Sequence, residues 1–361
     1  MRNRRLLIVD DSAVIRHAVA AAFGEQPGIE VVGTASTGRL ALMKIPLLQP
    51  DVVLLDISMP GMDGIETLAA IRRIQPRLPV IILNVLTTQA ASATLGALIR
   101  GATDFVMKPV GDYPSDAALK VLIDELVAKV ALWCPVGVHR PLLAATAAPD
   151  AVRRYGGAVA AARVDVLAIG TSTGGPGALM DLIARLPADF PVPILIVQHM
   201  PPIFTKLLAD RLAATSSLSV AEAAGGHAVS PGQAWIAPGD FHMEVRRDGP
   251  AVRIVTQQNA PENSCRPAVD VLFRSVAEVY GAHVLAVVMT GMGQDGLRGC
   301  QQIQAAGGQI LVQDEASSVV WGMPGFVARA GIADQVVPLS RMADEIVARV
   351  LRQRRSVRAA I

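Results

Sequence analysis

Acidic residues and a lysine follow separate apolar runs in the first third of the chain. Asp10 and Asp11 come directly after LLIV, Asp56 ends DVVLLD, and Lys108 ends ATDFVMK. If these runs are strands of one open parallel sheet, their carboxyl ends share a crevice in which the side chains can converge. Crowded carboxylates repel one another unless a cation joins them, and Mg²⁺ suits an all-oxygen site that also admits phosphate oxygens. The pattern predicts a Mg²⁺ site formed by Asp10, Asp11 and Asp56.

The same acidic site could carry out a phosphoryl transfer. Asp56 can act as a carboxylate nucleophile toward a phosphoryl donor, while the metal ion and Lys108 offset the charge on the transferred group. A simpler explanation of the acidic doublet alone is that Asp11 or Ser12 caps a helix that begins near Ala13. The phosphoryl-transfer hypothesis therefore depends on the doublet occurring together with Asp56 and Lys108.

A second reactive group lies in the other half of the chain. The string GTSTG around Ser172 fits a strand, tight turn and helix that present a nucleophilic serine, which needs a base and an orienting acid. His199 follows PILIVQ, and Asp295 lies in TGMGQDG after HVLAVVM, so both fall at predicted strand ends. The order Ser, His, Asp differs from that of α/β-hydrolases, so these residues predict a triad but not that fold.

Simpler explanations also exist for these residues. A serine in a glycine-rich turn can cap the following helix or line a phosphate site, and a histidine at a strand end is usually structural. In addition, Gly291, Gly293 and Gly296 spell GxGxxG between a strand and a helix, and Asp314 ends the next strand. This is the fingerprint of a dinucleotide-binding site, so a nucleotide-dependent oxidoreductase is an alternative function for the second half.

The elements that must position these residues alternate along the chain. Short apolar runs are separated by longer helical patterns, which is typical of βαβ units and predicts parallel sheets. Two segments that flank Asp248, Gly249 and Pro250 predict a β-hairpin instead. A stretch rich in Pro, Gly and Ala at 132–163 has no apolar period and is a candidate linker. The predicted strands comprise residues 6–9, 29–35, 51–56, 80–83 and 102–108, followed by VDVLAIG, PILIVQH, AWIAPG, HVLAVVMT and QILVQD.

Length and composition favour two α/β domains. A chain of 361 residues exceeds what one compact core usually organises, and 52% hydrophobic residues with 4% aromatics suit helices layered on buried parallel strands. The 33 basic and 31 acidic residues are spread along the chain, which argues against a nucleic-acid partner and a basic membrane anchor. The fold class expected is α/β, with two doubly wound parallel-sheet domains.

The sequence also indicates a cytoplasmic location without direct membrane insertion. No apolar run approaches the roughly 18 residues that a spanning helix needs, and Asp10 interrupts the apolar stretch after the basic N-terminus. Cys134, Cys265 and Cys300 are odd in number and lack metal-ligand spacing, so they are interpreted as reduced thiols with packing roles.

Residues 5–128 resemble a response-regulator receiver domain, which has a flavodoxin-like fold. The resemblance rests on VDDSAVIR, DVVLLDISMPGMDG and FVMKP in that order. It implies that Asp56 is phosphorylated by a histidine kinase with Mg²⁺, and that Lys108 and position 84 form the phosphorylation switch. Asn84 stands where the family carries Ser or Thr, and Ser58 stands where a larger side chain is common. Because an amide reaches farther than a hydroxyl, we expect Asn84 to close its loop incompletely on a phosphoryl group.

Residues 164–350 resemble the chemotaxis protein-glutamate methylesterase catalytic domain, a Rossmann-like fold. The matching segments are IGTSTGGPGAL, VQHMPP, SCRPAVDVLF, VVMTGMGQDG and QDEASSVVWGMPG. The resemblance implies that Ser172 attacks a receptor glutamate methyl ester with His199 as base and Asp295 as orienting acid, releasing methanol. It also favours the N–H of Met292 as an oxyanion donor and implies deamidation of receptor glutamines. Arg266, Glu315 and Met323 lie in matching segments, but packing explains each of them equally well.

The order of the two domains suggests regulation. The receiver is expected to cover the hydrolase cleft until phosphorylation of Asp56 shifts the population toward an open arrangement. The partners implied are methyl-accepting chemotaxis receptors as substrate and a histidine kinase as phosphodonor. A different possibility is that the second domain is an inactive adaptor gated by phosphorylation, although Ser172, His199 and Asp295 are all present.

Overall fold

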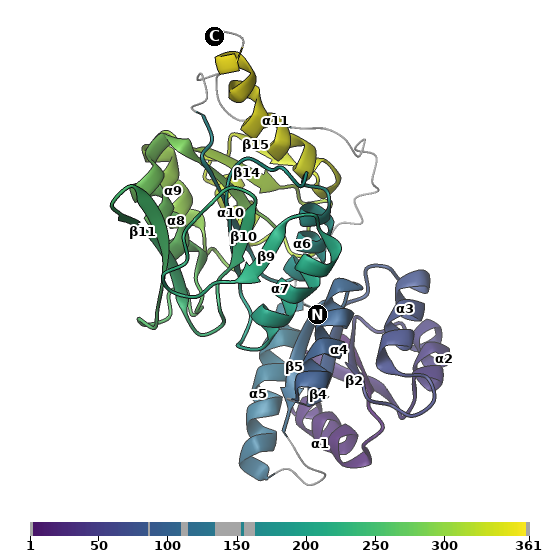
Figure 1. The fold of residues 1–361 in the computed structure, drawn as a ribbon. Coiled ribbons are helices and arrows are strands. Elements are labelled where there is room, and N and C mark those ends of the chain that lie inside the picture. The colour runs from purple at the N-terminus through teal and green to yellow at the C-terminus, as the bar shows by residue number, and fades with distance from the viewer. Residues whose placement is uncertain (1–2, 86, 110–114, 134–152, 155–162, 359–361) are drawn as a thin grey trace. The chain divides into compact units, whose positions relative to one another are not determined.

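The computed structural model describes residues 3–85, 87–109, 115–133, 153–154 and 163–358. The chain divides into two compact units, Met1–Thr146 and Ala147–Ile361 (Figure 1). The predicted linker, residues 132–163, lies for the most part outside the described residues. Within the described ranges, no helix combines the length and apolar character that crossing a bilayer requires.

The N-terminal unit has one parallel sheet in the order β2-β1-β3-β4-β5, which is the flavodoxin-like order. All five predicted strands are confirmed, with shifts of a few residues at their ends. The strands are β1 (Arg4–Val9), β2 (Ile29–Ala35), β3 (Val52–Asp56), β4 (Val80–Val85) and β5 (Asp104–Lys108). The helices are α1 (Ala13–Gly24), α2 (Gly38–Leu48), α3 (Gly64–Ile74), α4 (Thr88–Ile99) and α5 (Asp116–Trp133).

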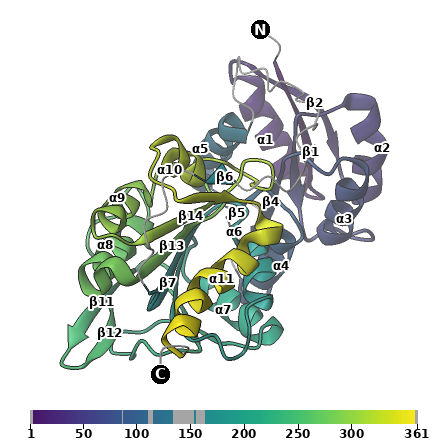
Figure 2. The same cartoon turned by 90° about the horizontal axis from the view of Figure 1, so that it is seen from above.

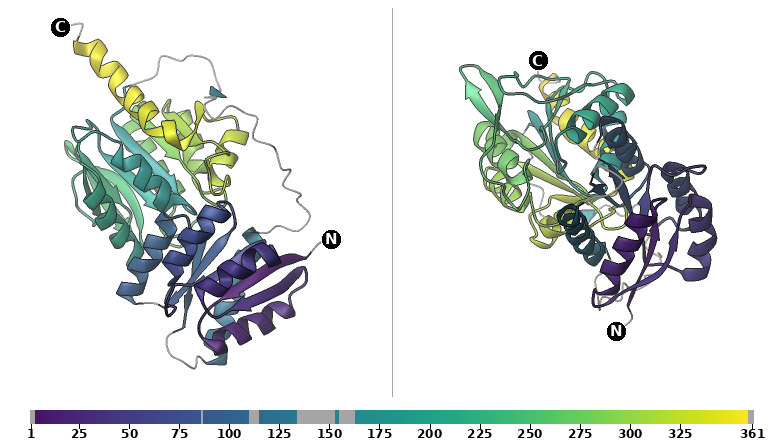
Figure 3. Two further views of the ribbon diagram at one scale, coloured as in Figure 1. Left: turned by 90° about the vertical axis from the view of Figure 1, so that its right-hand side faces the viewer. Right: turned by 90° about the horizontal axis from the view of Figure 1, so that it is seen from below.

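Helices cover both faces of this sheet because alternate strand residues point to opposite sides. Leu6 and Ile8 pack with Phe23 of α1 and Leu126 of α5 in one core cluster. Figure 2 shows α1 on this side and α2 with α3 on the other, and the views of Figure 3 show the same layering. Ser12 caps α1, since its hydroxyl accepts the N–H of Ile15, as the simpler explanation of this segment had predicted. The capping role and a nearby acidic site are therefore compatible.

The C-terminal unit has a larger sheet in the order β6-β15-β14-β13-β7-β8-β10-β9. Every neighbouring pair is parallel except β15 with β6. The predicted hairpin is confirmed as a separate antiparallel pair, β11 with β12. The strands are β6 (Arg153–Arg154), β7 (Val166–Thr171), β8 (Ile194–Gln198), β9 (Ser219–Glu222), β10 (Gln233–Ile236), β11 (His242–Asp248), β12 (Ala251–Gln257), β13 (Val284–Val288), β14 (Gln309–Gln313) and β15 (Gln335–Val337).

Three helices pack on each face of this sheet. One face carries α8, α9 and α10, whose apolar residues share a core cluster with Val166 and Ala168 of β7. Figure 2 shows α6, α7 and α11 on the opposite face. The helices are α6 (Gly175–Ala184), α7 (Phe204–Thr215), α8 (Val269–Tyr280), α9 (Leu297–Ala305), α10 (Met323–Arg329) and α11 (Leu339–Arg358), with a short 3₁₀ helix at Gly281–His283.

The strand order places the crevice of the C-terminal unit at β7. From β7 the chain continues to β8 on one side, and it later returns through β13 on the other side. Where strand order reverses in this way, the loops at the carboxyl ends diverge and leave room for a ligand. Ser172 directly follows β7, and the segment 289–296 directly follows β13. The two predicted motifs therefore meet at the switch point of the sheet.

Candidate functional site

The acidic residues and the lysine of the N-terminal unit meet at the carboxyl edge of its sheet. Lys108 Nζ lies 2.9 Å from Asp56 Oδ1 and 3.1 Å from Asp10 Oδ2. Carboxylate oxygens of Asp10, Asp11 and Asp56 lie within 4.8 Å of one another, with Asp10 and Asp56 buried and Asp11 exposed. This is the convergence that the positions of the strand ends predicted.

The donor set fits a divalent cation. Asp56 Oδ2 is buried and makes no hydrogen bond among the described residues, so one acceptor of this carboxylate is unused. Burial raises the pKa of Asp56, although the charge of Lys108 opposes this. Burial alone would lower the pKa of Lys108, but the charges of Asp56 and Asp10 raise it above its ordinary value. A cation beside Asp11 would favour the ionised form of Asp56.

Asn84 is buried and bound to α4. Its Nδ2 donates to Ala90 O and to Thr94 Oγ1, both at 3.0 Å, and its Oδ1 accepts the N–H of Val85 at 2.9 Å. An amide nitrogen has two hydrogens, so both are already used. The donor predicted to meet a phosphoryl group is therefore engaged elsewhere in this structure. Ser58 is exposed, and its main-chain N–H lies 3.4 Å from Asp56 Oδ1.

Ser172 lies in the tight turn between β7 and α6. Its carbonyl accepts the N–H of Gly175 at 2.8 Å, and its own N–H donates to Thr290 O at 3.1 Å. Gly174 has a φ of 78°, a left-handed conformation that favours glycine. A Cβ on Gly291 would lie 2.8 Å from Ser172 Cβ, so the turn after β13 packs directly against Ser172.

His199 and Asp295 are in direct contact. His199 Nε2 lies 2.7 Å from Asp295 Oδ2, and its Nδ1 lies 3.5 Å from Cys265 Sγ. A carboxylate only accepts hydrogen bonds, so Nε2 carries a hydrogen and the Nδ1 lone pair of a neutral ring is left to act as base. The Ser172 hydroxyl makes no hydrogen bond to His199 or to any other described residue. The thiol of Cys265 thus occupies the nitrogen that Ser172 would need.

The His199 and Asp295 pair is strongly polarised. Burial alone would lower the pKa of His199, but the Asp295 hydrogen bond, with contributions from Cys265, raises it to about 9. Burial alone would raise the pKa of Asp295, but the hydrogen bond and charge of His199 hold it below its ordinary value. Both effects favour a protonated imidazole beside an ionised carboxylate.

The main-chain N–H of Met292 is available as a donor. Within the part of the chain that the structure describes it donates to no acceptor, whereas Gly291 N donates to Val320 O at 3.1 Å. The Met292 side chain is 41% exposed, so this turn borders the surface beside Ser172. An unused N–H at this position fits an oxyanion donor.

Comparison with known proteins identifies the family. Residues 6–119 match the response regulator receiver domain, and residues 167–346 match the CheB methylesterase. The protein-glutamate methylesterase/protein-glutamine glutaminase of Trichodesmium erythraeum is 48% identical over 352 residues, which cover 97% of this chain and all of that protein. The chain belongs to this methylesterase family.

Other members of the methylesterase family are similar to the whole chain or to its second half. The protein of the same name from Nocardioides sp. is 46% identical over 360 residues, covering 99% of this chain and 98% of that protein. The crystal structure of the Thermotoga maritima CheB methylesterase catalytic domain is 42% identical, with a TM-score of 0.50, and covers 52% of this chain and 98% of that one. These relatives agree with the receiver and methylesterase resemblances found in the sequence.

The oxidoreductase alternative is not supported. Gly291 packs closely against Ser172 and Met323 because it has no side chain. A Cβ added to Gly291 would lie only 2.4 Å from Met323 Sδ. Asp314 accepts the N–H of Ser317 at 3.0 Å in a local turn, as well as the Ser317 hydroxyl. Gly291 and the acid of the fingerprint therefore have structural roles here.

The sequence patterns assign no role in the site to Asn263 or Asp270, and they assign Cys265 only a packing role. Asn263 and Asp270 contact Asp295 or its neighbourhood, and Cys265 contacts His199. All three lie in or beside the SCRPAVD segment, which was noted only for its resemblance. In contrast, Arg266 binds Asp240 and two carbonyls of its own loop, Met323 is buried in the core and Glu315 is exposed.

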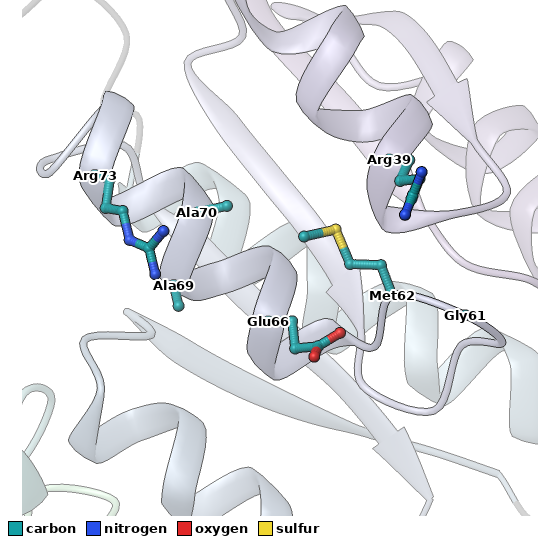
Figure 4. Close-up of a pocket in the computed structure, with 7 residues that line it drawn as sticks. All are labelled: Arg39, Gly61, Met62, Glu66, Ala69, Ala70 and Arg73. Atoms are coloured by element: carbon teal, nitrogen blue, oxygen red, sulfur yellow. The ribbon is translucent and has the colours of Figure 1, made fainter.

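A separate surface pocket of about 520 Å³ lies beside α3 in the N-terminal unit. Figure 4 shows Glu66 and Arg73 of α3 on its wall, with Arg39 at the start of α2 opposite. Its lining contains none of the predicted site residues and consists of Arg39, Gly61, Met62, Glu66, Ala69, Ala70 and Arg73.

Proposed function

We propose that this chain hydrolyses glutamate methyl esters on chemotaxis receptors, with Ser172 as nucleophile. The observation that carries the proposal is the 2.7 Å contact between His199 and Asp295 beside the turn that holds Ser172, within a domain of the methylesterase family. The names of the relatives, protein-glutamate methylesterase/protein-glutamine glutaminase, supply the substrate class.

The chemistry follows from the two ring nitrogens of His199. Nδ1 removes the proton of Ser172 as its oxygen attacks the ester carbonyl, and the imidazolium is stabilised by Asp295 at Nε2. The N–H of Met292 stabilises the oxyanion. The proton then passes from Nδ1 to the leaving methanol, and a water molecule activated in the same way releases the glutamate. With a glutamine substrate the leaving group is ammonia.

One rearrangement must precede this reaction. In the structure Nδ1 of His199 faces Cys265 at 3.5 Å, and Ser172 is not hydrogen-bonded to it. A change of side-chain rotamer at Ser172, or a small shift of the His199 ring, would replace the Cys265 thiol with the Ser172 hydroxyl as the partner of Nδ1. Such tightening on substrate binding is common at catalytic hydrogen bonds.

Regulation is assigned to the N-terminal unit. Asp10, Asp11 and Asp56 would hold Mg²⁺, which supplies positive charge for phosphoryl transfer to Asp56 when it is bound, and Lys108 would contact the phosphoryl group. A histidine kinase is the proposed donor. Before phosphorylation the receiver restrains the methylesterase domain, and phosphorylation relieves this restraint. We propose the cytoplasm as the location, with no nucleic-acid partner and no direct membrane insertion.

The direct test is methanol release from methylated receptor by the full chain, with and without a small phosphodonor and Mg²⁺. We expect hydrolysis that increases when Asp56 is phosphorylated, and Asp56→Asn should abolish the increase but not the basal rate. A folded protein that binds receptor but releases no methanol under either condition would establish the adaptor alternative instead.

Removal of the receiver tests how the regulation works. A fragment from residue 164 onward keeps every proposed catalytic residue and loses the restraining domain, so it should be active without a phosphodonor. Its turnover should exceed that of the unphosphorylated full chain. A fragment with native circular dichroism that is slower than the full chain would show that the receiver activates rather than inhibits.

Asn84→Thr should raise the ratio of phosphorylated to unphosphorylated activity. The substitution removes the two bonds that hold Asn84 to α4 and supplies a short hydroxyl donor for the phosphoryl group. If the new hydroxyl favours the phosphorylated state over the unphosphorylated state by about 1 kcal/mol more than Asn84 does, phosphorylation would shift the conformational equilibrium about fivefold further. The ratio is measured at equal phosphorylation of both proteins, and a ratio that stays the same or falls contradicts this explanation of Asn84.

A further inference from the structure

Asp295 is surrounded by five hydrogen-bond donors. Its Oδ2 accepts from His199 Nε2 at 2.7 Å and from the N–H of Val269 at 2.6 Å. Its Oδ1 accepts from Asn263 Nδ2 at 2.8 Å and from the N–H groups of Asp270 and Gly296, both at 3.0 Å. Three of the donors are main-chain groups, which no side-chain substitution removes. Apart from His199, Asn263 is the side chain that holds this carboxylate among the described residues.

Asn263 also binds a second buried carboxylate. Its Nδ2 lies 3.0 Å from Asp270 Oδ2, while Asp270 Oδ1 accepts the N–H of Gly299 at 2.7 Å. Each amide hydrogen can therefore serve one carboxylate. Burial, followed by the charge of Asp295, raises the pKa of Asp270. Without a donor between them, these two acceptors would face each other with their repulsion uncompensated.

The loop holds this amide in place before any substrate arrives. Asn263 has a φ of 52°, a left-handed conformation that asparagine tolerates better than most residues. Its neighbour Glu262 forms a bidentate pair with Arg274 of α8, with both oxygen to nitrogen distances at 2.6 Å. His242 bonds to Ala260 O at 3.1 Å and to the N–H of Ala268 at 3.2 Å, so it fixes both ends of the loop.

Asn263 itself is exposed, while Asp295 and Asp270 are 2% and 1% exposed. Its amide nitrogen reaches the two buried carboxylates from this exposed position. A residue of this kind contributes little to the core, so its replacement should leave the fold intact. Its polar contacts all lead toward the triad.

We propose that Asn263 is a positioning residue for the esterase reaction, whose amide orients Asp295 toward His199 and separates it from the charge of Asp270. The inference rests on the proposed triad. Asn263 does not contact the reacting atoms, and it acts on the base His199 through Asp295.

The sign of its effect on His199 follows from electrostatics. Removal of the amide takes a donor from Asp295 and leaves the repulsion by Asp270 unshielded, so the site becomes more negative and the pKa of His199 rises further. Removal of the Asp270 charge acts in the opposite direction. The charged or titratable groups around the pair formed by His199 and Asp295 are Asp270, Glu262, Arg274, His242 and Cys265.

The test compares Asn263→Ala, Asn263→Ala with Asp270→Asn, and wild type in the full chain. We expect kcat to fall roughly 10- to 100-fold in Asn263→Ala with little change in KM, because a hydrogen bond to a charged group is lost. The acid limb of kcat/KM should move to higher pH in the single variant and return toward the wild-type position in the double variant. A purely structural role would lower the rate at every pH, leave the limb in place and not be reversed by Asp270→Asn.

Two further variants make this result decisive. Asn263→Asp keeps the side-chain shape and the tolerance of a left-handed φ but replaces the amide donor with a negative charge. The acid limb of its kcat/KM profile should therefore move to higher pH at least as far as in Asn263→Ala. Ser264, at the next position, also has a left-handed φ of 62°, and its side chain binds neither carboxylate. Ser264→Ala is therefore a matched control, and the acid limb of its kcat/KM profile should not move. A limb that stays in place or moves to lower pH in both Asn263 variants overturns the proposal.

A measurement without substrate separates this inference from the proposed function. The ring of His199 is titrated by NMR in ¹⁵N-histidine-labelled protein, with His199→Gln to assign its signal among the six histidines. We expect a higher pKa of His199 in Asn263→Ala than in wild type, whether or not the enzyme hydrolyses receptor esters. Unchanged titration overturns the positioning role, whereas absent methanol release with shifted titration overturns the proposed function alone.

Discussion

Ser172→Ala is expected to reduce methyl-ester hydrolysis by a factor on the order of 10³ or more, since it removes the proposed nucleophile. His199→Ala should have a comparable effect because it removes the proposed base. Asp295→Ala should cost somewhat less, because a neutral His199 keeps part of its basicity without the carboxylate. Initial rates of methanol release from methylated receptor measure all three.

Combination of these variants gives the stronger evidence. Residues that act as a unit are not additive, so the double variant of Ser172 and His199 should be hardly slower than either single variant. Ser216→Ala, at the C-terminal end of α7, is a matched serine control and should retain wild-type turnover. Near wild-type activity in folded Ser172→Ala would end the triad hypothesis, and additive losses would show that the residues act independently.

The activity should also depend steeply on pH. The base must be unprotonated, and the hydrogen bond to Asp295 raises the pKa of His199 to about 9. At pH 7 the neutral form is then about 1% of the total, so kcat/KM should rise roughly tenfold per pH unit and level off above about pH 9. Between pH 7 and 9 the expected change is about 50-fold, because half of His199 is still protonated at pH 9. A pH-rate profile with a receptor fragment that is stable over this range measures it.

Two variants identify the group that titrates. Asp295→Asn removes the charge that raises the pKa of His199, so its acid limb should move to lower pH while the plateau falls. Cys265→Ala should also move the limb to lower pH, since the thiol contributes to the raised pKa. An acid limb near 6.5 in wild type, the ordinary value for histidine, would contradict a strongly coupled pair.

The same coupling affects stability. His199 has a higher pKa in the folded chain than its ordinary value of 6.5, so its protonation stabilises the fold. This contribution is complete below about pH 6.5 and is lost as the pH rises toward about 9. The pH dependence of unfolding should therefore become flatter over this window in His199→Gln.

Two features of the structure indicate a resting state. Asn84 uses both amide hydrogens on α4, and His199 directs Nδ1 at Cys265 rather than at Ser172. Each feature places a group with a proposed role in function in contact with another partner. The pattern fits a regulated enzyme in which the contacts must be exchanged before turnover.

Much of this protein was determined by the sequence itself. Asp10, Asp56 and Lys108 end buried apolar runs, and the carboxyl ends of parallel strands lie at one edge of a sheet, so their convergence followed from periodicity alone. Ser172 was predicted from the GTSTG motif, and His199 and Asp295 from their positions at predicted strand ends. β6, β9 and β15 were missed because they are short, and two to four residues give only a weak alternation signal; β6 lies within the predicted linker.

Only the tertiary structure decided how these residues are held. The loop that carries Asn263 and Cys265 has no period, and its contacts join residues up to 66 positions apart in the chain. Which nitrogen of His199 faces Asp295, and where the amide of Asn84 points, depends on side-chain rotation against neighbours from other elements. Sequence patterns report which face of a strand or helix is apolar. They carry no information on the direction of a hydrogen bond across a loop, because that direction is chosen by packing after the elements have met.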